Sequence, residues 1–397
     1  MGSPAVERLE RLWLSIVKSI MWRGEAPMLR VYEGSLVEDR PGANAPASYR
    51  KYSLTDERTS HKYSQCVAVS KIILELQTSN PPRTMSQRDV YYALKSMFRK
   101  QAECNAIILD LGLMLGLRRH EMGILAQAKG LVAGLIRYRF HAKAKTNSMD
   151  EDSKDEDGNS DAEFEPSVSA WTDCTSSGPA LIHSQHWLSL DEDDIEIQLP
   201  TGITDGHLPK PLFLLVVEKE GIFQRLVEDQ IFLNKNSPCI LITACGYPDV
   251  ATRRAVSLIA QRYPSLTVVG VADYNTHGLA VLLTYMLPSA ATAHEARGFS
   301  VGGDRMHWMG MRTKHIEDLR RRQLDESHFQ PFSENDAKHA NALLRSPKLD
   351  ELPDEFRNEV ECMLEMRCKV ELESLYALGL EVCSEWVQNS LQDLDWI

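Results

Sequence analysis

Between residues 212 and 287, short apolar runs alternate with amphipathic segments, and this alternation limits the fold more than any other feature of the chain. The apolar runs are LFLLVV (212–217), CILIT (239–243) and LTVVGVA (266–272). Each is typical of a strand that is buried on both faces. The segments that follow them have helical periodicity, so the order predicts an α/β domain with a parallel sheet and right-handed crossovers. From Ser333 onward the pattern predicts further helices, including one long helical stretch over residues 360–379.

Polar side chains directly follow two of these predicted strands. Glu218 comes after the first strand and Asp273 after the third, with Asn275 two residues further on. The carboxyl ends of parallel strands share one edge of a sheet, so we expect these side chains to lie close together. Carboxylate and amide oxygens are ligands that Mg²⁺ takes, usually with waters and a phosphate. The alternative is that the acids only cap the helices that follow, and their spacing leaves both possibilities open.

Charge is unevenly distributed along the chain, although the formal net charge is −12. Residues 83–145 hold twelve Lys or Arg against four acids, whereas residues 150–165 hold nine acids and one lysine. A basic block of this kind is typical of a nucleic-acid-binding module, and plain solvated surface is the alternative. Residues 146–176 lack periodicity and are rich in Ser, Asp and Glu, so we expect them to be disordered and to separate two domains.

The basic block has a recognisable order of elements. Residues 86–99 and 102–115 have helical periodicity, and residues 121–140 alternate around a Lys129-Gly130 turn, which predicts a β-hairpin. Two helices followed by a hairpin favour a winged-helix domain. Residues 5–22 also predict a helix, whose apolar face needs a cover, either from the protein's own fold or from a partner subunit.

Two adjacent tyrosines, Tyr91 and Tyr92, lie in the first helix of the basic block. At about 100° per residue, Tyr91 borders the apolar face, whereas Tyr92 points to the opposite side among Arg88, Lys95 and Arg99. Positive charge stabilises a phenolate and also holds a phosphodiester, so Tyr92 is a candidate nucleophile. A surface tyrosine that stacks on nucleic acid is the alternative.

The remaining composition narrows the class of protein. The eight cysteines include no CxxC pair and no His/Cys cluster, which argues against a zinc site and against a disulfide framework. No apolar stretch approaches a membrane span, and no signal-peptide pattern stands at the N-terminus. We therefore expect an intracellular protein without a membrane segment.

Five segments occur together in an order that is found in one protein family. These segments are SQRDVYY, VVEKEGIFQRLVED, GYPDVATR, DYNTHGLAV and HWMGMR. Together they closely resemble the meiotic double-strand-break transesterases, the eukaryotic relatives of the A subunit of topoisomerase VI. The resemblance extends over residues 60–397, with the acidic tract as an insertion.

The resemblance implies a winged-helix (CAP-like) DNA-binding domain followed by a Toprim domain with a parallel sheet and C-terminal helices. The implied limits are 1–62 for an N-terminal partner-docking extension, 63–145 for the winged-helix domain, 146–176 for the acidic insert and 177–397 for the Toprim domain. The resemblance implies that the protein acts on double-stranded DNA in the nucleus. The resemblance therefore also implies a homodimer, or a heterodimer with a paralogue, and a topoisomerase VI B-like partner subunit.

The resemblance also implies roles for individual residues. Tyr92 is the nucleophile, which attacks a backbone phosphate and leaves the protein linked to a DNA 5′ end. Arg88 orients or neutralises that phosphate, and Glu218, Asp273 and Asn275 hold Mg²⁺. The residues expected to contact DNA are Arg88, Lys95, Arg99, Lys129 and Tyr247.

One position departs from the family pattern. Asn275 stands where the family has a second Asp, which removes a negative charge and is expected to weaken metal affinity.

Three functions remain open. The first is a Mg²⁺-dependent transesterase that makes meiotic DNA double-strand breaks to initiate recombination. The second is a catalytically weak, DNA-binding paralogue that acts as the partner in a heterodimeric complex. The third is a Toprim nuclease that uses metal and water without a tyrosine.

Overall fold

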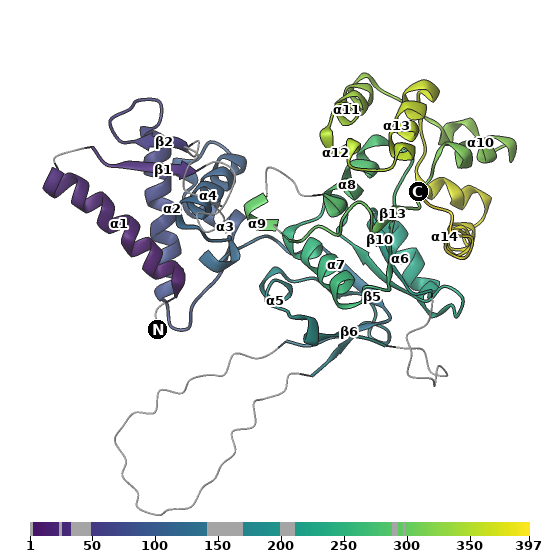
Figure 1. Ribbon diagram of the computed structural model, residues 1–397, viewed down its shortest axis with the longest axis horizontal. Helices are drawn as coiled ribbons and strands as arrows, with labels where there is room; N and C mark the ends of the chain where they lie inside the picture. Colours follow the sequence, from purple (N-terminus) through teal and green to yellow (C-terminus); the bar gives the residue numbers. More distant parts are fainter. Residues whose placement is uncertain are drawn as a thin grey trace, which may run out of the picture.

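The computed structural model describes residues 3–23, 26–32, 49–140, 170–198, 211–287, 293–296 and 298–397. Two hydrophobic cores divide these residues, one formed between Ala5 and Ile124 and the other between Val132 and Leu391. Figure 1 shows them as two bodies, with the N-terminal body in purple and blue and the larger body in teal to yellow. Helices dominate the first body, and a sheet forms the centre of the second.

The N-terminal body is built on two long helices. In chain order its elements are α1 (Pro4–Arg23), β1 (Met28–Tyr32), β2 (Tyr49–Ser53), α2 (Ser60–Thr78), β3 (Met85–Ser86), α3 (Gln87–Ala93), the 3-10 helix η2 (Lys95–Met97), α4 (Gln101–Leu115), the 3-10 helix η3 (His120–Met122) and β4 (Ile124–Leu125). Helices α2 and α4 pack on each other, and α1 and the β1–β2 hairpin lie against them. Leu9, Val31 and Tyr52 are buried in the same core as Val90 and Ile108, so the N-terminal residues form part of this body.

Helix α3 is shorter than the sequence predicted. Its N-terminus is capped by Ser86, whose Oγ accepts a hydrogen bond from the backbone N–H of Asp89 at 3.1 Å. The helix ends at Ala93, because Leu94 leaves the helical conformation with φ −114° and the 3-10 helix η2 follows. Arg99, which was expected on the same helical face as Tyr92, therefore lies beyond the end of the helix.

The β-hairpin predicted for residues 121–140 is wrong. Strand β4 pairs in parallel with β3, whereas β5 (Leu131–Gly134) runs antiparallel to β11 (Cys239–Thr243) of the larger body. Each segment does form a strand, but its partner lies far away in the sequence. The strand that was expected to form the wing, and that was assigned to a domain ending at residue 145, thus packs in the core of the larger body.

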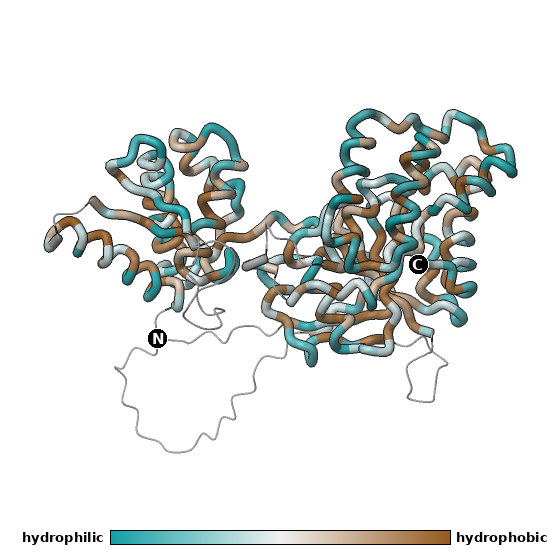
Figure 2. Tube along the Cα trace, turned by 45° about the horizontal axis from the view of Figure 1, so that its top comes forward, coloured by the Kyte–Doolittle hydropathy of each residue, from teal (hydrophilic) through white to brown (hydrophobic). Residues whose placement is uncertain are grey.

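The larger body is an α/β structure with a six-stranded sheet. The strand order is β13 (Met306–Trp308), β12 (Thr267–Val271), β10 (Phe213–Val217), β11, β5 and β8 (Ala180–Leu181). The first four strands are mutually parallel, and three of them, β10, β11 and β12, are the strands that the sequence predicted. Strand β5 runs antiparallel to its neighbours β11 and β8. The predicted helices are also present as α6 (Glu220–Glu228), α7 (Val250–Arg262) and α8 (Thr276–Met286). Figure 2 shows hydrophobic residues, in brown, concentrated in the interior of this body.

A second, small sheet flanks the large one. It consists of β7 (Thr172–Asp173), β6 (Ile136–Tyr138) and β9 (Ile195–Ile197), with β6 in the middle. Residues 146–169 of the acidic insert lie outside the described residues. Residues 170–176 are described, and β7 pairs with β6 through Arg137 and Asp173. The disorder predicted for this end of the insert is therefore wrong.

The C-terminal part is helical, as predicted, but it is interrupted at a decisive point. Its elements are α10 (Thr313–Arg321), β14 (Gln330–Pro331), α11 (Glu334–Leu344), α12 (Pro347–Asp350), α13 (Asp354–Met366), β15 (Cys368–Lys369), the 3-10 helix η8 (Leu372–Leu378) and α14 (Val382–Gln392). The predicted helical stretch over 360–379 breaks at Arg367, which has φ 52°. The chain then pairs with the end of β12, where Tyr274 and Val370 exchange backbone hydrogen bonds of 2.9 and 3.2 Å. Among the described residues, none of the helices has the length and apolarity that a bilayer span needs.

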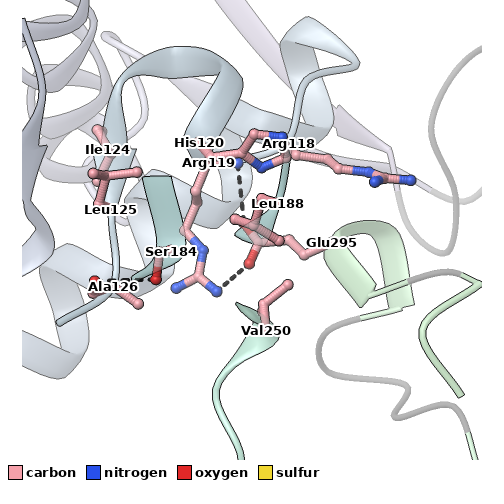
Figure 3. Close-up of a pocket in the computed structure, with 10 residues that line it drawn as sticks. All are labelled: Arg118, Arg119, His120, Ile124, Leu125, Ala126, Ser184, Leu188, Val250 and Glu295. Carbon is pink, nitrogen blue, oxygen red and sulfur yellow. Dashed lines mark hydrogen bonds and ion pairs between the residues drawn. The ribbon is translucent and has the colours of Figure 1, made fainter. Parts of the chain in front are cut away.

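The two bodies meet through charged side chains (Figure 3). Arg119 of the N-terminal body forms an ion pair with Glu295 of α9 (Ala293–Ala296), and its backbone N–H donates to Glu295 Oε1 at 3.3 Å. The guanidinium of Arg118 lies 5.1 Å from the ring centroid of Phe299, and that of Arg254 lies 5.4 Å from it. Glu295 and Phe299, which follow α8 in the sequence, thus connect the N-terminal body to helix α7 of the larger body.

Candidate active site

The register of the parallel strands brings Glu218 and Asp273 together. Val217, the last residue of β10, pairs with Thr243 on one side and with Val271 on the other. The backbone N–H of Glu218 donates to Val271 O at 2.9 Å, and the backbone N–H of Asp273 donates to Glu218 Oε2 at 3.4 Å. The expectation that these two carboxylates lie at one edge of the sheet is therefore confirmed.

Asn275 has a structural task at the same edge. Its Oδ1 accepts a hydrogen bond from the backbone N–H of Gly278 at 2.7 Å and so caps the N-terminus of α8. A Cβ at Gly278 would lie 2.7 Å from Glu218 Oε2 and 3.2 Å from the carbonyl oxygen of Asp273, so this carboxylate lies directly against the first turn of α8. The alternative that the two acids only cap the following helices is wrong, because α6 has no side-chain cap and α8 is capped by Asn275.

Lys219 places an ammonium group among these carboxylates, which the sequence did not predict. Its Nζ lies 2.8 Å from Asp273 Oδ2, 2.8 Å from Glu373 Oε2 and 3.4 Å from Glu371 Oε2. The two glutamates arrive with the segment that follows the break at Arg367, because Leu372 N–H donates to Asp273 Oδ1 at 2.9 Å. The sequence feature that could have indicated these glutamates is the segment KVELESL (369–375). Its local periodicity, however, does not show that the chain returns to the sheet edge there.

The pKa values at this edge record competing effects. Burial, together with the nearby Asp273 carboxylate, raises the pKa of Glu218 to about 7. Burial also raises the pKa of Asp273, although the Lys219 ammonium and the Leu372 N–H act in the opposite direction. Burial acts to lower the pKa of Lys219, but Asp273 and Glu373 outweigh it and raise that pKa. At Asp273, whose side chain is only 2% exposed, burial outweighs the effect of the ion pair on the pKa. At Lys219, which is 26% exposed, the effect of the neighbouring carboxylates outweighs burial.

The donor atoms at this edge suit a hard divalent cation. Glu218 and Asp273 offer carboxylate oxygens, whereas the amide oxygen of Asn275 is occupied by the helix cap. In the part of the chain that the structure describes, no three His, Cys, Asp or Glu side chains are arranged to hold a metal by themselves. The chemistry fits a cation that keeps several waters and shares its shell with a phosphate, as Mg²⁺ does.

Tyr92 lies in the N-terminal body with its ring exposed, and the predicted orientation of α3 is confirmed. Its side chain is 51% exposed, whereas Tyr91 packs against the hydrophobic core. Arg88 Nη2 lies 3.5 Å from Tyr92 Oη, a long hydrogen bond, and the charged groups of Arg88 and Lys95 lie 5.7 and 5.9 Å from the ring centroid. The hydrogen bond from Arg88 and the charges of Arg88 and Lys95 lower the pKa of Tyr92.

Lys129 and Tyr247 are brought together at the sheet edge. The ammonium of Lys129 donates to the backbone carbonyl of Tyr247, and Cys245 Sγ donates to the carbonyl of Lys129 at 3.3 Å. Because β5 is antiparallel to β11, Lys129 enters β5 at the edge where β11 ends. Glu218 lies at this edge too, since its carbonyl accepts the N–H of Gly246 at 2.9 Å.

The predicted site residues thus form two groups in different bodies. Tyr92 and Arg88 lie on α3 and Lys95 just after it, whereas Glu218 and Asp273 lie at the carboxyl edge of the large sheet. Figure 1 shows α3 and strand β10 in different bodies. Within the described ranges, no hydrogen bond or ion pair joins Tyr92 to either carboxylate. Arg99 is not brought to the phenol, and its backbone N–H bonds to Glu103 instead, at 2.9 Å.

Comparisons with known proteins match both bodies. Residues 213–390 match the family described as the Toprim domain of Spo11 and of the A subunit of topoisomerase 6, and residues 61–124 match the family described as Type IIB DNA topoisomerase. The chain is 28% identical to the human Meiotic recombination protein SPO11, over 100% of this chain and 89% of that protein. It is 27% identical to Meiotic recombination protein SPO11-2 of Arabidopsis thaliana, over 87% and 77%. It is also 27% identical to the A3 subunit of DNA topoisomerase 6 from Oryza sativa subsp. indica, over 79% and 60%.

These findings define the larger body as a Toprim domain, in which a mostly parallel sheet carries acidic residues at its carboxyl edge. The second matched segment ends at residue 124, where the first hydrophobic core also ends. The chain belongs to the family of Spo11 and the topoisomerase VI A subunit.

Proposed function

We propose that this chain is a topoisomerase-like DNA transesterase that makes meiotic DNA double-strand breaks and so initiates recombination. One observation carries the proposal: the exposed phenol of Tyr92 lies beside Arg88 and Lys95 in a chain whose Toprim edge holds two adjacent carboxylates. Its substrate is double-stranded chromosomal DNA, so we place the protein in the nucleus.

The reaction exchanges one phosphodiester for another. Tyr92 Oη attacks the phosphorus of a backbone phosphate, the bond to the 3′ oxygen breaks, and that oxygen leaves as a 3′ hydroxyl after gaining a proton. The DNA 5′ end stays linked to Tyr92 through its phosphate, and no water is consumed. Arg88 favours the phenolate and pairs with a phosphate oxygen. Glu218 and Asp273 would hold Mg²⁺, which supplies positive charge to the phosphate when bound.

The separation of the two groups supports a shared active site. Since Tyr92 contacts neither Glu218 nor Asp273, we propose that the tyrosine of one protomer meets the carboxylates of a second protomer, in a homodimer or in a heterodimer with a paralogue. We also propose that the helices of the N-terminal body form the winged-helix (CAP-like) DNA-binding domain, although residues 131–138 cannot serve as its wing. Lys95, Arg99, Lys129 and Tyr247 would then contact the DNA backbone.

Removal of Arg88 is expected to slow cleavage strongly. Arg88→Ala should lower the yield of covalent protein–DNA adduct about 10²-fold, because it removes the hydrogen bond and the nearer charge that stabilise the phenolate. Arg88→Lys should retain part of the activity, since it keeps the charge and loses the planar fork. Adducts formed with labelled duplex DNA and Mg²⁺ can be trapped in detergent and counted. Arg58→Ala, at an exposed arginine before α2, is the matched control and should give the yield of the wild type. A yield from Arg88→Ala equal to those of the wild type and of Arg58→Ala would contradict the role of Arg88.

The same assay distinguishes the other two functions. A catalytically weak paralogue is favoured by one observation, the commitment of Asn275 Oδ1 to the cap of α8. In that case the purified protein alone would form no adducts, and adducts would appear only with a second, catalytically competent chain. Release of free DNA ends without attached protein would instead favour a Toprim nuclease.

The exposed face of α1 is the proposed docking surface for a topoisomerase VI B-like subunit. Leu9 is buried against the protein's own core, whereas Leu14, Ile20 and Trp22 are exposed. Replacing Ile20 and Trp22 by Glu should abolish co-purification with such a subunit without unfolding the chain, because neither side chain is in the core. Leu380→Glu, at an exposed leucine of the larger body, controls for added charge. Undiminished co-purification of the double variant would rule out this surface.

A further inference from the structure

Both carboxylate oxygens of Asp273 are already engaged. Oδ1 accepts the backbone N–H of Leu372 at 2.9 Å, and Oδ2 lies 2.8 Å from the ammonium of Lys219. The first partner belongs to the main chain, which is fixed by the pairing of Tyr274 with Val370. A divalent cation can therefore gain an oxygen of Asp273 most readily by displacing Lys219.

Lys219 has a second place to go. The same ammonium lies 2.8 Å from Glu373 Oε2 and 3.4 Å from Glu371 Oε2, and both glutamates are more exposed than Asp273. A flexible four-carbon side chain can turn between these oxygens without a change in the backbone. A divalent cation at Asp273 would also repel the ammonium toward the two glutamates.

We propose that Lys219 is a positioning residue for cation loading: it holds Asp273 in the cation-free protein and moves fully onto Glu371 and Glu373 when a divalent cation takes Asp273 Oδ2. This inference rests on the proposed function, because it takes Glu218 and Asp273 as the cation-binding residues. It also gives Glu371 and Glu373 a role at the site, although they lie far from Lys219 in the sequence.

Direct binding of Mn²⁺ to the full-length protein tests the inference without DNA or cleavage. The signal of free Mn²⁺ in electron paramagnetic resonance gives the dissociation constant, at pH 8.5 so that Glu218 is ionised. Lys219→Met should lower that constant roughly tenfold, because a competing positive charge is removed. Lys219→Arg should stay near the wild type, and Lys235→Met, at an exposed turn before β11, is the matched control. An unchanged or higher constant for Lys219→Met would overturn the inference.

A double-mutant cycle separates transfer of Lys219 from simple charge effects. Glu373→Gln alone should weaken Mn²⁺ binding, since Lys219 then has a poorer alternative to Asp273. In the Lys219→Met background the same substitution should have little effect, because Glu373 acts through the ammonium. Equal effects in both backgrounds would contradict the proposal. If Lys219→Met does not fold, the variant with Glu371→Gln and Glu373→Gln keeps the test open, and unaltered binding by that protein would refute the inference.

Asp273→Asn distinguishes failure of this inference from failure of the proposed function. If Asp273→Asn binds Mn²⁺ as tightly as the wild type, the proposed cation site itself is wrong. If Asp273→Asn weakens binding and Lys219→Met leaves it unchanged, only the role of Lys219 is wrong.

Discussion

Tyr92→Phe is expected to abolish covalent attachment of DNA and to leave DNA binding nearly intact. The substitution removes a single oxygen, the proposed nucleophile, and keeps the ring that lies beside Arg88 and Lys95. Loss of a nucleophile lowers turnover by at least about 10³-fold, so detergent-stable adducts should fall below detection. Binding to labelled duplex DNA, measured at fixed salt, should change about twofold or less, because the positive charges remain.

Tyr91→Phe is the matched control for this experiment. Tyr91 is the adjacent residue on the same helix, but it packs against the hydrophobic core, whereas Arg88 donates its hydrogen bond to the Tyr92 hydroxyl. The variant should therefore form adducts at the level of the wild type. Adducts that persist in Tyr92→Phe, or that vanish in Tyr91→Phe, would contradict the assignment of the nucleophile.

Glu218→Gln is expected to lower the cleavage activity and to raise the stability of the cation-free protein. The amide removes one of the two carboxylates proposed to hold the cation, so cleavage should fall by about 10²-fold or more. The same substitution should stabilise the cation-free protein at neutral and higher pH. A pKa raised from 4.5 to about 7 means that the ionised side chain destabilises the folded state by about 3 kcal/mol.

The pH dependence of this gain follows from the direction of the pKa shift. At acidic pH, below the unfolded-state value of 4.5, Glu218 is protonated in both states and costs nothing. Between that value and about 7 the unfolded chain ionises first, so the wild type progressively loses stability that the Gln variant keeps. Thermal unfolding in a chelator should show a small difference between the two proteins at pH 5 and a large one at pH 8. Glu228→Gln, an exposed glutamate of α6, should show no such trend, and an equal gain at both pH values would contradict the account.

Local patterns were sufficient to predict the centre of the fold. Strands β10 and β11 are buried at every residue, and β12 at every residue except Thr267. Short runs of Val, Ile and Leu between amphipathic helices are typical of such buried parallel strands. The neighbourhood of Glu218 and Asp273 followed from one rule, that parallel strands end at the same edge. The outward orientation of Tyr92 required only the positions of apolar residues on a single helix.

Contacts between distant segments could not be predicted in this way. The alternation that suggested a hairpin at residues 121–140 was real, but the choice of β11 as the partner of β5 depends on the assembled sheet. Lys219 and Glu373 are separated by more than a hundred residues. They meet because α13 ends before Arg367 and the chain then returns to the sheet edge. Asn275 was recognised as a departure from the family, whereas its role as a helix cap required the position of Gly278.

The most direct test of the central claim is chemical identification of the linked residue. The purified protein is incubated with duplex DNA and Mg²⁺, the DNA is digested, and the peptide that contains Tyr91 and Tyr92 is fragmented in a mass spectrometer. We expect a nucleotide joined through its 5′ phosphate to the oxygen of Tyr92. DNA cleavage without such a peptide, or with the nucleotide on any other residue, would contradict the account.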